Sequence, residues 1–119
     1  MTKEDLQRWL DAYVKAWRSY DPAAIGDLFT DDARYAYHPY DDEPLKGREA
    51  IVENWLSDRD DPDSWEASYE PFLIEGDRAV AVGETRYADG TVYANLWVMR
   101  FAGDGRCVEY VEWFMKHPK

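Results

Sequence analysis

The stretch EGDRAVAVGETRYADGTVYANLWVMRFAGDGR, residues 75–106, decides the fold class. Apolar and polar side chains alternate along it with a period of two, which is typical of β-strands. Turn signals at Gly76-Asp77, Asp89-Gly90 and residues 103–105 divide it into runs of about ten residues. With the runs that flank it from Trp65 onward, the stretch predicts an antiparallel meander of four long strands.

The N-terminal half of the chain has helical spacing instead. Apolar side chains recur every three or four positions along residues 3–20, with Thr2 as the expected N-cap and Asp5 as its capping-box partner. Asp21 as a cap, followed by Pro22 at the first helical position, predicts a second, short helix.

A third helix is expected after Gly47, in GREAIVENWL, and a short strand in ARYAYHP, residues 33–39. Helices that come first and a sheet that comes second form the α+β pattern. A chain of 119 residues has room for one hydrophobic core. We therefore predict a single α+β domain over residues 1–119, with three N-terminal helices packed on an antiparallel sheet.

The charge and the cysteine content exclude several functions. A net charge of −11 argues against nucleic acid and anionic membranes as partners, because their phosphates attract Lys and Arg. Cys107 is the only cysteine, so no internal disulfide is expected. The start MTKEDLQRWL lacks the apolar segment of a signal peptide, and no apolar run approaches the roughly 18 residues that span a bilayer. We expect a cytoplasmic protein.

Turn lengths predict a register for the sheet. A two-residue turn at Asp89-Gly90 places Glu84 opposite Asn95, and a four-residue turn at residues 102–105 places Asn95 opposite Glu112. Tyr69 then lies beside Glu84. Asparagine is unusual inside a strand, so a row of polar side chains across four strands indicates the wall of a pocket. The side chains expected around this row are Trp97, Tyr110, Arg86, Tyr93 and Phe114.

The opposite face of the sheet is expected to be flat and mostly apolar, with Ala81, Leu96, Val98 and Val111. Three helices can cover only one face of a sheet. We therefore expect a homodimer through this second face; the alternative is an ordinary exposed face with scattered apolar side chains.

The motifs DLFTDDARYAYHP and LKGREAI, followed by WVMRF, DGR and the last strand, resemble the NTF2-like superfamily, in its SnoaL-like branch, over nearly the whole chain. The resemblance implies a conical α+β fold, in which a curved sheet wraps a long helix and an apolar pocket opens at the wide end. It also implies that the convex face of the sheet often dimerises.

The family includes ketosteroid isomerases, polyketide cyclases, scytalone dehydratase and limonene epoxide hydrolase. Many other members bind ligands without catalysis, so the fold alone does not determine the activity. The isomerases' hydrogen-bonding tyrosine matches Tyr13. Their general-base aspartate falls on Tyr37 or His38, and their oxyanion-hole aspartate falls on Trp97, so steroid isomerisation is not expected. Glu84, Arg86, Glu112 and Asn95 offer chemistry similar to that of the epoxide hydrolase, with different spacing. Scytalone dehydratase uses two pocket histidines, and in this chain only His38 is well placed to match one of them.

These observations lead to two hypotheses. In the first, the pocket binds a small apolar organic molecule and catalyses isomerisation, cyclisation, dehydration or hydration by acid/base chemistry without a cofactor. Glu84 or Glu112 is then the proton-transfer group, and Asn95 orients the substrate or a water. Glu112 is the first choice as base, because Glu84 is expected to stay ionised beside Arg86. His38 is an alternative base, or else an exposed loop histidine. The substrate-binding residues are expected to be Tyr13, Trp17, Tyr69, Arg86, Tyr93, Trp97 and Tyr110.

In the second hypothesis, the domain binds a ligand or a partner without turnover, and the polar row is a structural network. Neither hypothesis includes a metal. The run DRDDPD lacks the glycine and the distal glutamate of a calcium loop, and there is no His/Cys cluster for zinc.

Overall fold

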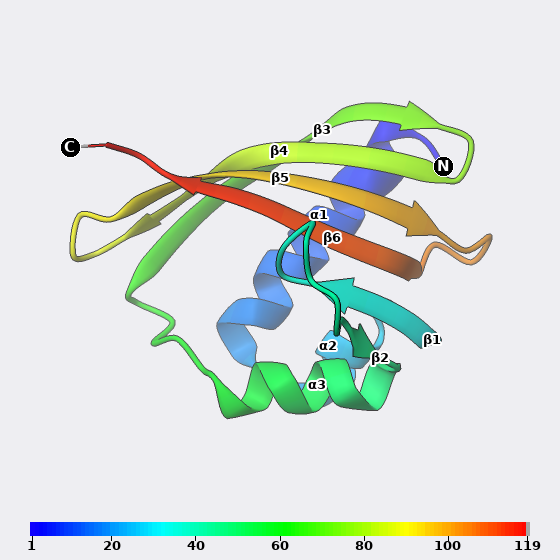
Figure 1. Ribbon diagram of the computed structural model, residues 1–119, viewed down its shortest axis with the longest axis horizontal. Coiled ribbons are helices and arrows are strands. Elements are labelled where there is room, and N and C mark those ends of the chain that lie inside the picture. Colours follow the sequence, from blue (N-terminus) through cyan, green and yellow to red (C-terminus); the bar gives the residue numbers. More distant parts are fainter. Residues whose placement is uncertain (119) are drawn as a thin grey trace.

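The computed structural model describes residues 1–118 and contains three helices and a six-stranded sheet. The helices are α1 (Lys3–Ser19), α2 (Pro22–Gly26) and α3 (Arg48–Ser57). The strands are β1 (Phe29–Ala36), β2 (Leu45–Lys46), β3 (Trp65–Glu75), β4 (Arg78–Tyr87), β5 (Val92–Phe101) and β6 (Cys107–Lys116). The sheet curves, and all three helices lie on its concave side (Figure 1). The α+β class and the meander from β3 to β6 are as the sequence predicts.

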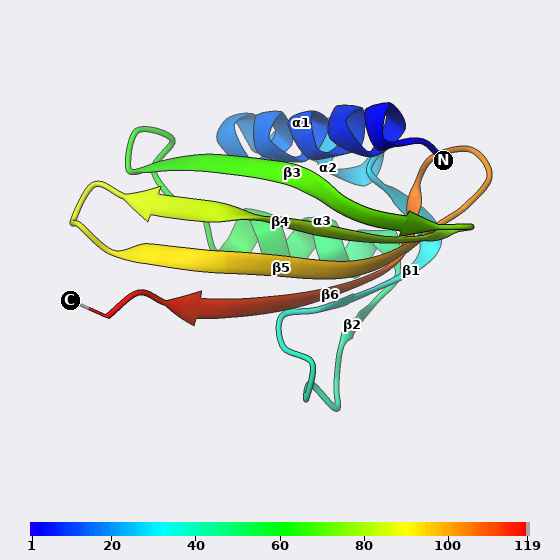
Figure 2. The same cartoon turned by 90° about the horizontal axis from the view of Figure 1, so that it is seen from above.

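The sheet has the strand order β2-β1-β6-β5-β4-β3. The last four strands form the meander, whereas β1 pairs in parallel with β6, and the short β2 pairs with the outer edge of β1. Helix α1 runs alongside β3, and α3 crosses behind the sheet (Figure 2). This arrangement leaves the convex face of the long strands without a covering layer.

The predicted helix starts are confirmed. The Thr2 hydroxyl accepts a hydrogen bond from the Asp5 backbone N–H, and the Asp5 carboxylate accepts one from the Thr2 N–H, which completes a capping box. The Asp21 carboxylate accepts from the Ala23 N–H, with Pro22 at the start of α2. Helix α1 ends where Tyr20 adopts the left-handed conformation, with φ of 52°.

The predicted register between β4 and β5 is wrong by one residue. The turn has three residues rather than two, because the Tyr87 N–H donates to the Thr91 carbonyl and Gly90 takes a positive φ of 95°. Asn95 is therefore opposite Gly83, not Glu84. A shift of one residue moves every side chain of β4 to the other face of the sheet.

The predicted register between β5 and β6 is wrong by two residues, which leaves the faces unchanged. A longer turn and an irregularity between Arg100 and Phe101 place Glu112 opposite Trp97 and Phe114 opposite Asn95. In β3, a second irregularity between Pro71 and Leu73 places Tyr69 opposite Gly83.

The convex face consequently differs from the predicted one. Ala81 is fully buried under the helices, so its assignment to the dimerisation face is wrong, whereas Val98 is 37% exposed on that face. Cys107 is buried in the core. Among residues 1–118, none of the helices is long and apolar enough to cross a membrane.

Candidate functional site

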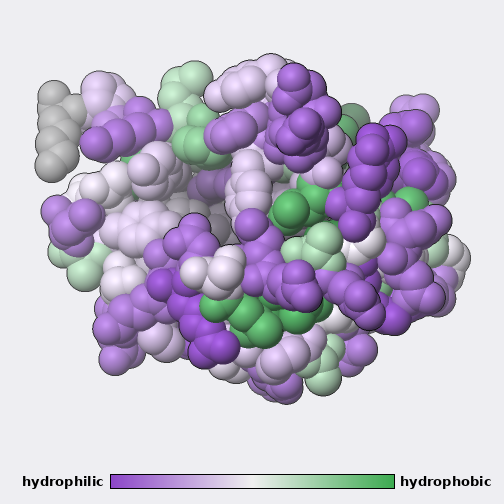
Figure 3. Space-filling view, turned by 60° about the horizontal axis from the view of Figure 1, so that its bottom comes forward, coloured by the Kyte–Doolittle hydropathy of each residue, from purple (hydrophilic) through white to green (hydrophobic). Residues whose placement is uncertain are grey.

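A pocket of about 440 Å³ lies between the helices and the concave face of the sheet. Of the eighteen lining residues within residues 1–118, eleven are aromatic. The helices and β1 contribute Tyr13, Trp17, Tyr20, Tyr35, Tyr37 and Trp55, and the long strands contribute Tyr69, Tyr87, Tyr93, Trp97 and Phe114. In the space-filling view, side chains of intermediate hydropathy surround a hollow in an otherwise mainly hydrophilic surface (Figure 3). The lining suits a mostly apolar organic ligand.

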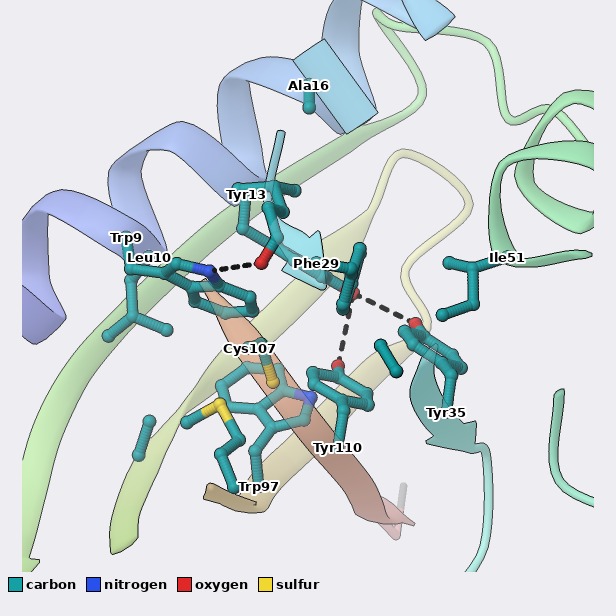
Figure 4. Packing of buried hydrophobic residues seen from close by; sticks show 14 of the residues in the cluster. Trp9, Leu10, Tyr13, Ala16, Phe29, Tyr35, Ile51, Trp97, Cys107 and Tyr110 are labelled. Atoms are coloured by element: carbon teal, nitrogen blue, oxygen red, sulfur yellow. Dashed lines mark hydrogen bonds between the residues drawn. The ribbon is translucent and has the colours of Figure 1, made fainter. Parts of the chain in front are cut away.

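Three tyrosines from distant parts of the chain meet beside the pocket. Tyr13 of α1 is hydrogen-bonded through its hydroxyl to those of Tyr35, at 3.4 Å, and Tyr110, at 3.2 Å (Figure 4). The rings of Tyr35 and Tyr110 are stacked, with centroids 4.3 Å apart. Burial raises the pKa of all three phenols well above the usual value, so they stay protonated at neutral pH. This cluster ties α1, β1 and β6 together.

A directed chain of hydrogen bonds crosses the pocket wall. The Thr85 hydroxyl donates to Asn95 Oδ1 at 2.8 Å, and Asn95 Nδ2 donates to Glu112 Oε2 at 3.1 Å. The Tyr69 and Thr85 hydroxyl oxygens are 2.6 Å apart. Since Thr85 has one hydroxyl proton and gives it to Asn95, Tyr69 is the donor in this pair. The chain runs Tyr69 to Thr85 to Asn95 to Glu112 and ends on a carboxyl group.

The pocket also alters the Glu112 carboxyl group. Burial raises its pKa to about 7, against the opposing effect of the hydrogen bond from Asn95. None of the residues 1–118 forms an ion pair with it. A carboxyl group with this pKa is present in both protonation states near neutrality, as general acid/base catalysis requires.

The open end of the pocket is acidic. The exposed Asp58 and the partly buried Asp60 follow α3, and Asp89 lies in the turn between β4 and β5. Asp60 accepts a hydrogen bond from the indole N–H of Trp17 at 3.2 Å, and its own backbone N–H donates to the Tyr20 hydroxyl at 2.7 Å. The run DRDDPD thus contributes Asp58 and Asp60 to one side of the pocket.

The structure brings most of the predicted site residues together. Seven of them line the pocket: Tyr13, Trp17, Tyr69, Tyr93, Asn95, Trp97 and Glu112. Tyr110 packs behind the lining, against Tyr13 and Tyr35. His38 lies outside the lining, with its ring stacked 4.9 Å from that of Tyr40 and 5.5 Å from that of Phe114.

Glu84 and Arg86 are the exceptions, and their predicted place in the pocket is wrong. Both lie on the convex face, where the Arg86 guanidinium pairs with Glu84 at 2.9 Å. The one-residue difference in the turn explains both errors. It also explains why the sequence interpretation missed Thr85, which takes the place in the pocket wall that was assigned to Glu84. If Ala88-Asp89-Gly90 is treated as a three-residue turn, the sequence predicts that Thr85 faces the pocket.

Within the part of the chain that the structure describes, residues 1–118, no group of three or more His, Cys, Asp or Glu side chains is arranged to hold a metal ion. The described lining residues carry hydroxyl, amide, carboxyl and indole N–H groups. The chemistry available from these side chains is proton transfer and hydrogen bonding.

Comparisons with known proteins agree with this architecture. The profile of the SnoaL-like domain matches residues 10–110. A search of curated proteins gave no match. Among solved structures, an NTF2-like protein of unknown function from Burkholderia xenovorans LB400 is 22% identical, with a TM-score of 0.75 over 98% of this chain and 87% of that one. Another, from Mesorhizobium loti, is 25% identical, with a TM-score of 0.69 over 95% of this chain and 93% of that one, and its function is also unknown. The chain belongs to the SnoaL-like domain family and has the NTF2-like fold.

Proposed function

We propose that the pocket binds a small organic molecule and that Glu112 transfers a proton to or from it, without a cofactor. The observation that carries this proposal is a carboxyl group inside an aromatic pocket, with a pKa raised to about 7 and with one oxygen held by Asn95. A general base is most effective when its pKa lies near the working pH.

The hydrogen-bond chain gives each residue a role in this proposal. Asn95 fixes Glu112 Oε2 and is itself held by Thr85, so the carboxyl group has a defined orientation. The second oxygen, Oε1, has no partner among the described residues in the hydrogen bonds and ion pairs of the structure, so it is the atom available to a ligand. Ionised Glu112 takes a proton at Oε1, and protonated Glu112 returns it to another atom of the same ligand. Isomerisation, cyclisation and dehydration use such a step; in hydration the proton that Glu112 takes comes from the attacking water and is given to the ligand.

One observation favours the second candidate function, a ligand-binding module without turnover. Tyr69, Thr85 and Asn95 satisfy one another, so this part of the row is complete without a substrate. The two functions differ in what Glu112 does, because only the catalytic one needs its proton to move. Proton transfer by Glu112 therefore decides between them.

A generic substrate for base catalysis tests the proposal without knowledge of the natural one. In 5-nitrobenzisoxazole, a base removes the proton at C3, the N–O bond breaks, and a coloured cyanonitrophenolate forms. We expect the wild type to accelerate this reaction, and Glu112→Gln to lose about 100-fold or more of the acceleration. The rate should rise with pH through a midpoint near 7, because the ionised carboxylate is the base.

Glu84→Gln is the matched control, because it removes a carboxylate of the same kind from the opposite face. Its rate and its pH profile should equal those of the wild type. If the wild type is no faster than Glu112→Gln, the result contradicts the catalytic proposal and favours the second candidate function, a ligand-binding module without turnover.

We also propose that a second copy of the chain covers the convex face. Large apolar side chains remain exposed there: Trp113, diagonal to Val98, is 49% accessible, and Met115, two residues further along β6, is 74% accessible. A contiguous exposed apolar area on a small domain is typical of an interface.

Val98→Asp should shift the protein from dimer to monomer in sedimentation velocity, because it places a charge in the middle of this face. Tyr40→Asp, at a loop position that is 80% exposed, adds the same charge elsewhere and should leave the dimer intact. A wild type that sediments as a monomer at high micromolar concentration would contradict self-association.

A further inference from the structure

The charged residues that line the pocket, among residues 1–118, are all acidic. Four carboxyl groups line it, Glu112 inside and Asp58, Asp60 and Asp89 at the open end, and none of the lining residues in the described chain is Lys, Arg or His. The chain as a whole carries a net charge of −11. A cavity with this lining attracts cations and repels carboxylates and phosphates.

Several basic side chains near the pocket lie outside its lining. Arg86 pairs with Glu84 on the convex face, and Arg18 packs over the ring of Trp65. Lys116 is opposite Tyr93 in the sheet but is exposed and does not line the pocket. Among residues 1–118, no basic side chain forms an ion pair with Glu112, Asp58 or Asp60.

The aromatic lining offers the second half of a cation site. Ring faces of Trp and Tyr attract ammonium and guanidinium groups, most strongly where water is excluded. The protein already makes two such contacts with its own cations: the Arg18 guanidinium is 4.2 Å from the centre of the Trp65 ring, and that of Arg59 is 5.4 Å from the centre of the Tyr20 ring. Tyr20 belongs to the pocket lining.

We infer that the ligand of this pocket is an organic cation, with an ammonium or quaternary ammonium group on a mostly apolar body. The aromatic rings would receive the body and the faces of the charged group, and the carboxyl groups would balance its charge. The inference rests on the proposed function, because it names the class of molecule that the same pocket binds. It adds that anionic substrates are excluded.

A bound cation and the ionised form of the proposed base, Glu112, would stabilise each other electrostatically. The titratable groups that face Glu112 from the surrounding elements are phenols with raised pKa, which stay neutral: Tyr13, Tyr35, Tyr37, Tyr69, Tyr87 and Tyr110. A bound positive charge is then the main group that lowers the pKa of Glu112 and keeps it in the form that accepts a proton. Affinity for the cation should rise from pH 6 to pH 8 as Glu112 ionises.

Three probes of nearly equal shape separate charge from size. They are 4-(trimethylammonio)benzyl alcohol, the uncharged 4-tert-butylbenzyl alcohol, and 4-(hydroxymethyl)benzenesulfonate. Binding can be followed at pH 8 by calorimetry and by fluorescence of the lining residues Trp17, Trp55 and Trp97. We expect the cation to bind about tenfold or more tightly than the neutral alcohol, and the sulfonate to bind more weakly than either.

Variants locate the charge that is responsible. Glu112→Gln should remove most of the preference for the cation while leaving affinity for the neutral alcohol nearly unchanged. Asp58→Asn, at the exposed end of the pocket, should lower affinity for the cation by about twofold and should flatten its salt dependence. Glu70→Gln, on the exposed convex side of β3, is the matched control and should change neither affinity.

Equal affinity for the cation and the neutral alcohol, preference for the sulfonate, or no binding of the cation at millimolar concentration would each overturn the inference. So would a preference for the cation that survives in Glu112→Gln and Asp58→Asn alike. These failures are distinguishable from failure of the proposed function, because the benzisoxazole assay uses an uncharged substrate and reports proton transfer alone.

Discussion

Glu112→Gln is expected to make the protein more stable at pH 8, by about 2–3 kcal/mol. The pKa of Glu112 is raised from the ordinary value of 4.5 to about 7 in the folded protein. Between these two values the unfolded chain has lost the proton that the folded protein still holds, so the free energy of unfolding falls as the pH rises. Above pH 7 this contribution is fully lost. Glutamine has no proton to lose and can still accept the hydrogen bond from Asn95.

Urea unfolding of both proteins at pH 5 and pH 8 measures this effect. The difference in the free energy of unfolding should be small at pH 5 and should reach its full value at pH 8. Glu84→Gln is the control, since the Glu84 carboxylate is partly exposed and paired with Arg86. A Glu112→Gln protein that is equally or less stable than the wild type at pH 8 would show that Glu112 is not destabilised by burial.

Gly83→Ala is expected to destabilise the protein by about 3 kcal/mol or more. A Cβ atom at this position would lie 2.2 Å from the Ser68 carbonyl oxygen, 2.5 Å from Cδ1 of Tyr69 and 2.8 Å from its Cα. Two of these three atoms belong to the backbone of β3, so β3 and β4 would have to separate. The absence of a side chain at Gly83 is what lets Tyr69 lie against β4 and reach Thr85.

Gly103→Ala is the matched control, because a Cβ atom at Gly103 would meet nothing within 4 Å. Thermal unfolding should show a large fall in midpoint for Gly83→Ala and almost none for Gly103→Ala. A Gly83→Ala protein with the stability of the wild type would mean that β3 and β4 are not packed as closely as described.

The helices illustrate what local sequence can predict. The starts of α1 and α2 depend on side chains that bond to a backbone N–H two or three residues away, as Thr2 does to Asp5 and Asp21 does to Ala23. Both ends of such a bond are visible in the sequence. The parallel pairing of β1 with β6 was not predicted, because nothing in either segment specifies a distant partner.

The sheet shows how a small error in a turn affects the site. One additional residue between β4 and β5 moved Glu84 and Arg86 out of the pocket and put Thr85 into it. The error between β5 and β6 was two residues, so Asn95 and Glu112 stayed on one face and still meet, diagonally rather than directly opposite. Asn95 was identifiable from the sequence because a buried amide needs partners.

The electrostatic environment of Glu112 could not be read from the sequence. The predicted row placed Arg86 nearby, and a cation there would have kept the neighbouring carboxylate ionised. In the structure Arg86 is on the other side of the sheet, and the pocket contains phenols instead. The choice of Glu112 as the base therefore stands as a proposal for a different reason, namely burial without a compensating charge.

The pKa of Glu112 itself is the quantity on which the proposed chemistry depends most directly. Carbon-13 NMR of the glutamate side-chain carboxyl groups, recorded from pH 3 to pH 9, measures it in the folded protein. We predict one resonance that titrates with a midpoint near 7 and is absent from the spectrum of Glu112→Gln. A spectrum in which the Glu112 carboxyl titrates between pH 4 and pH 5, with the ordinary glutamates, would contradict the account.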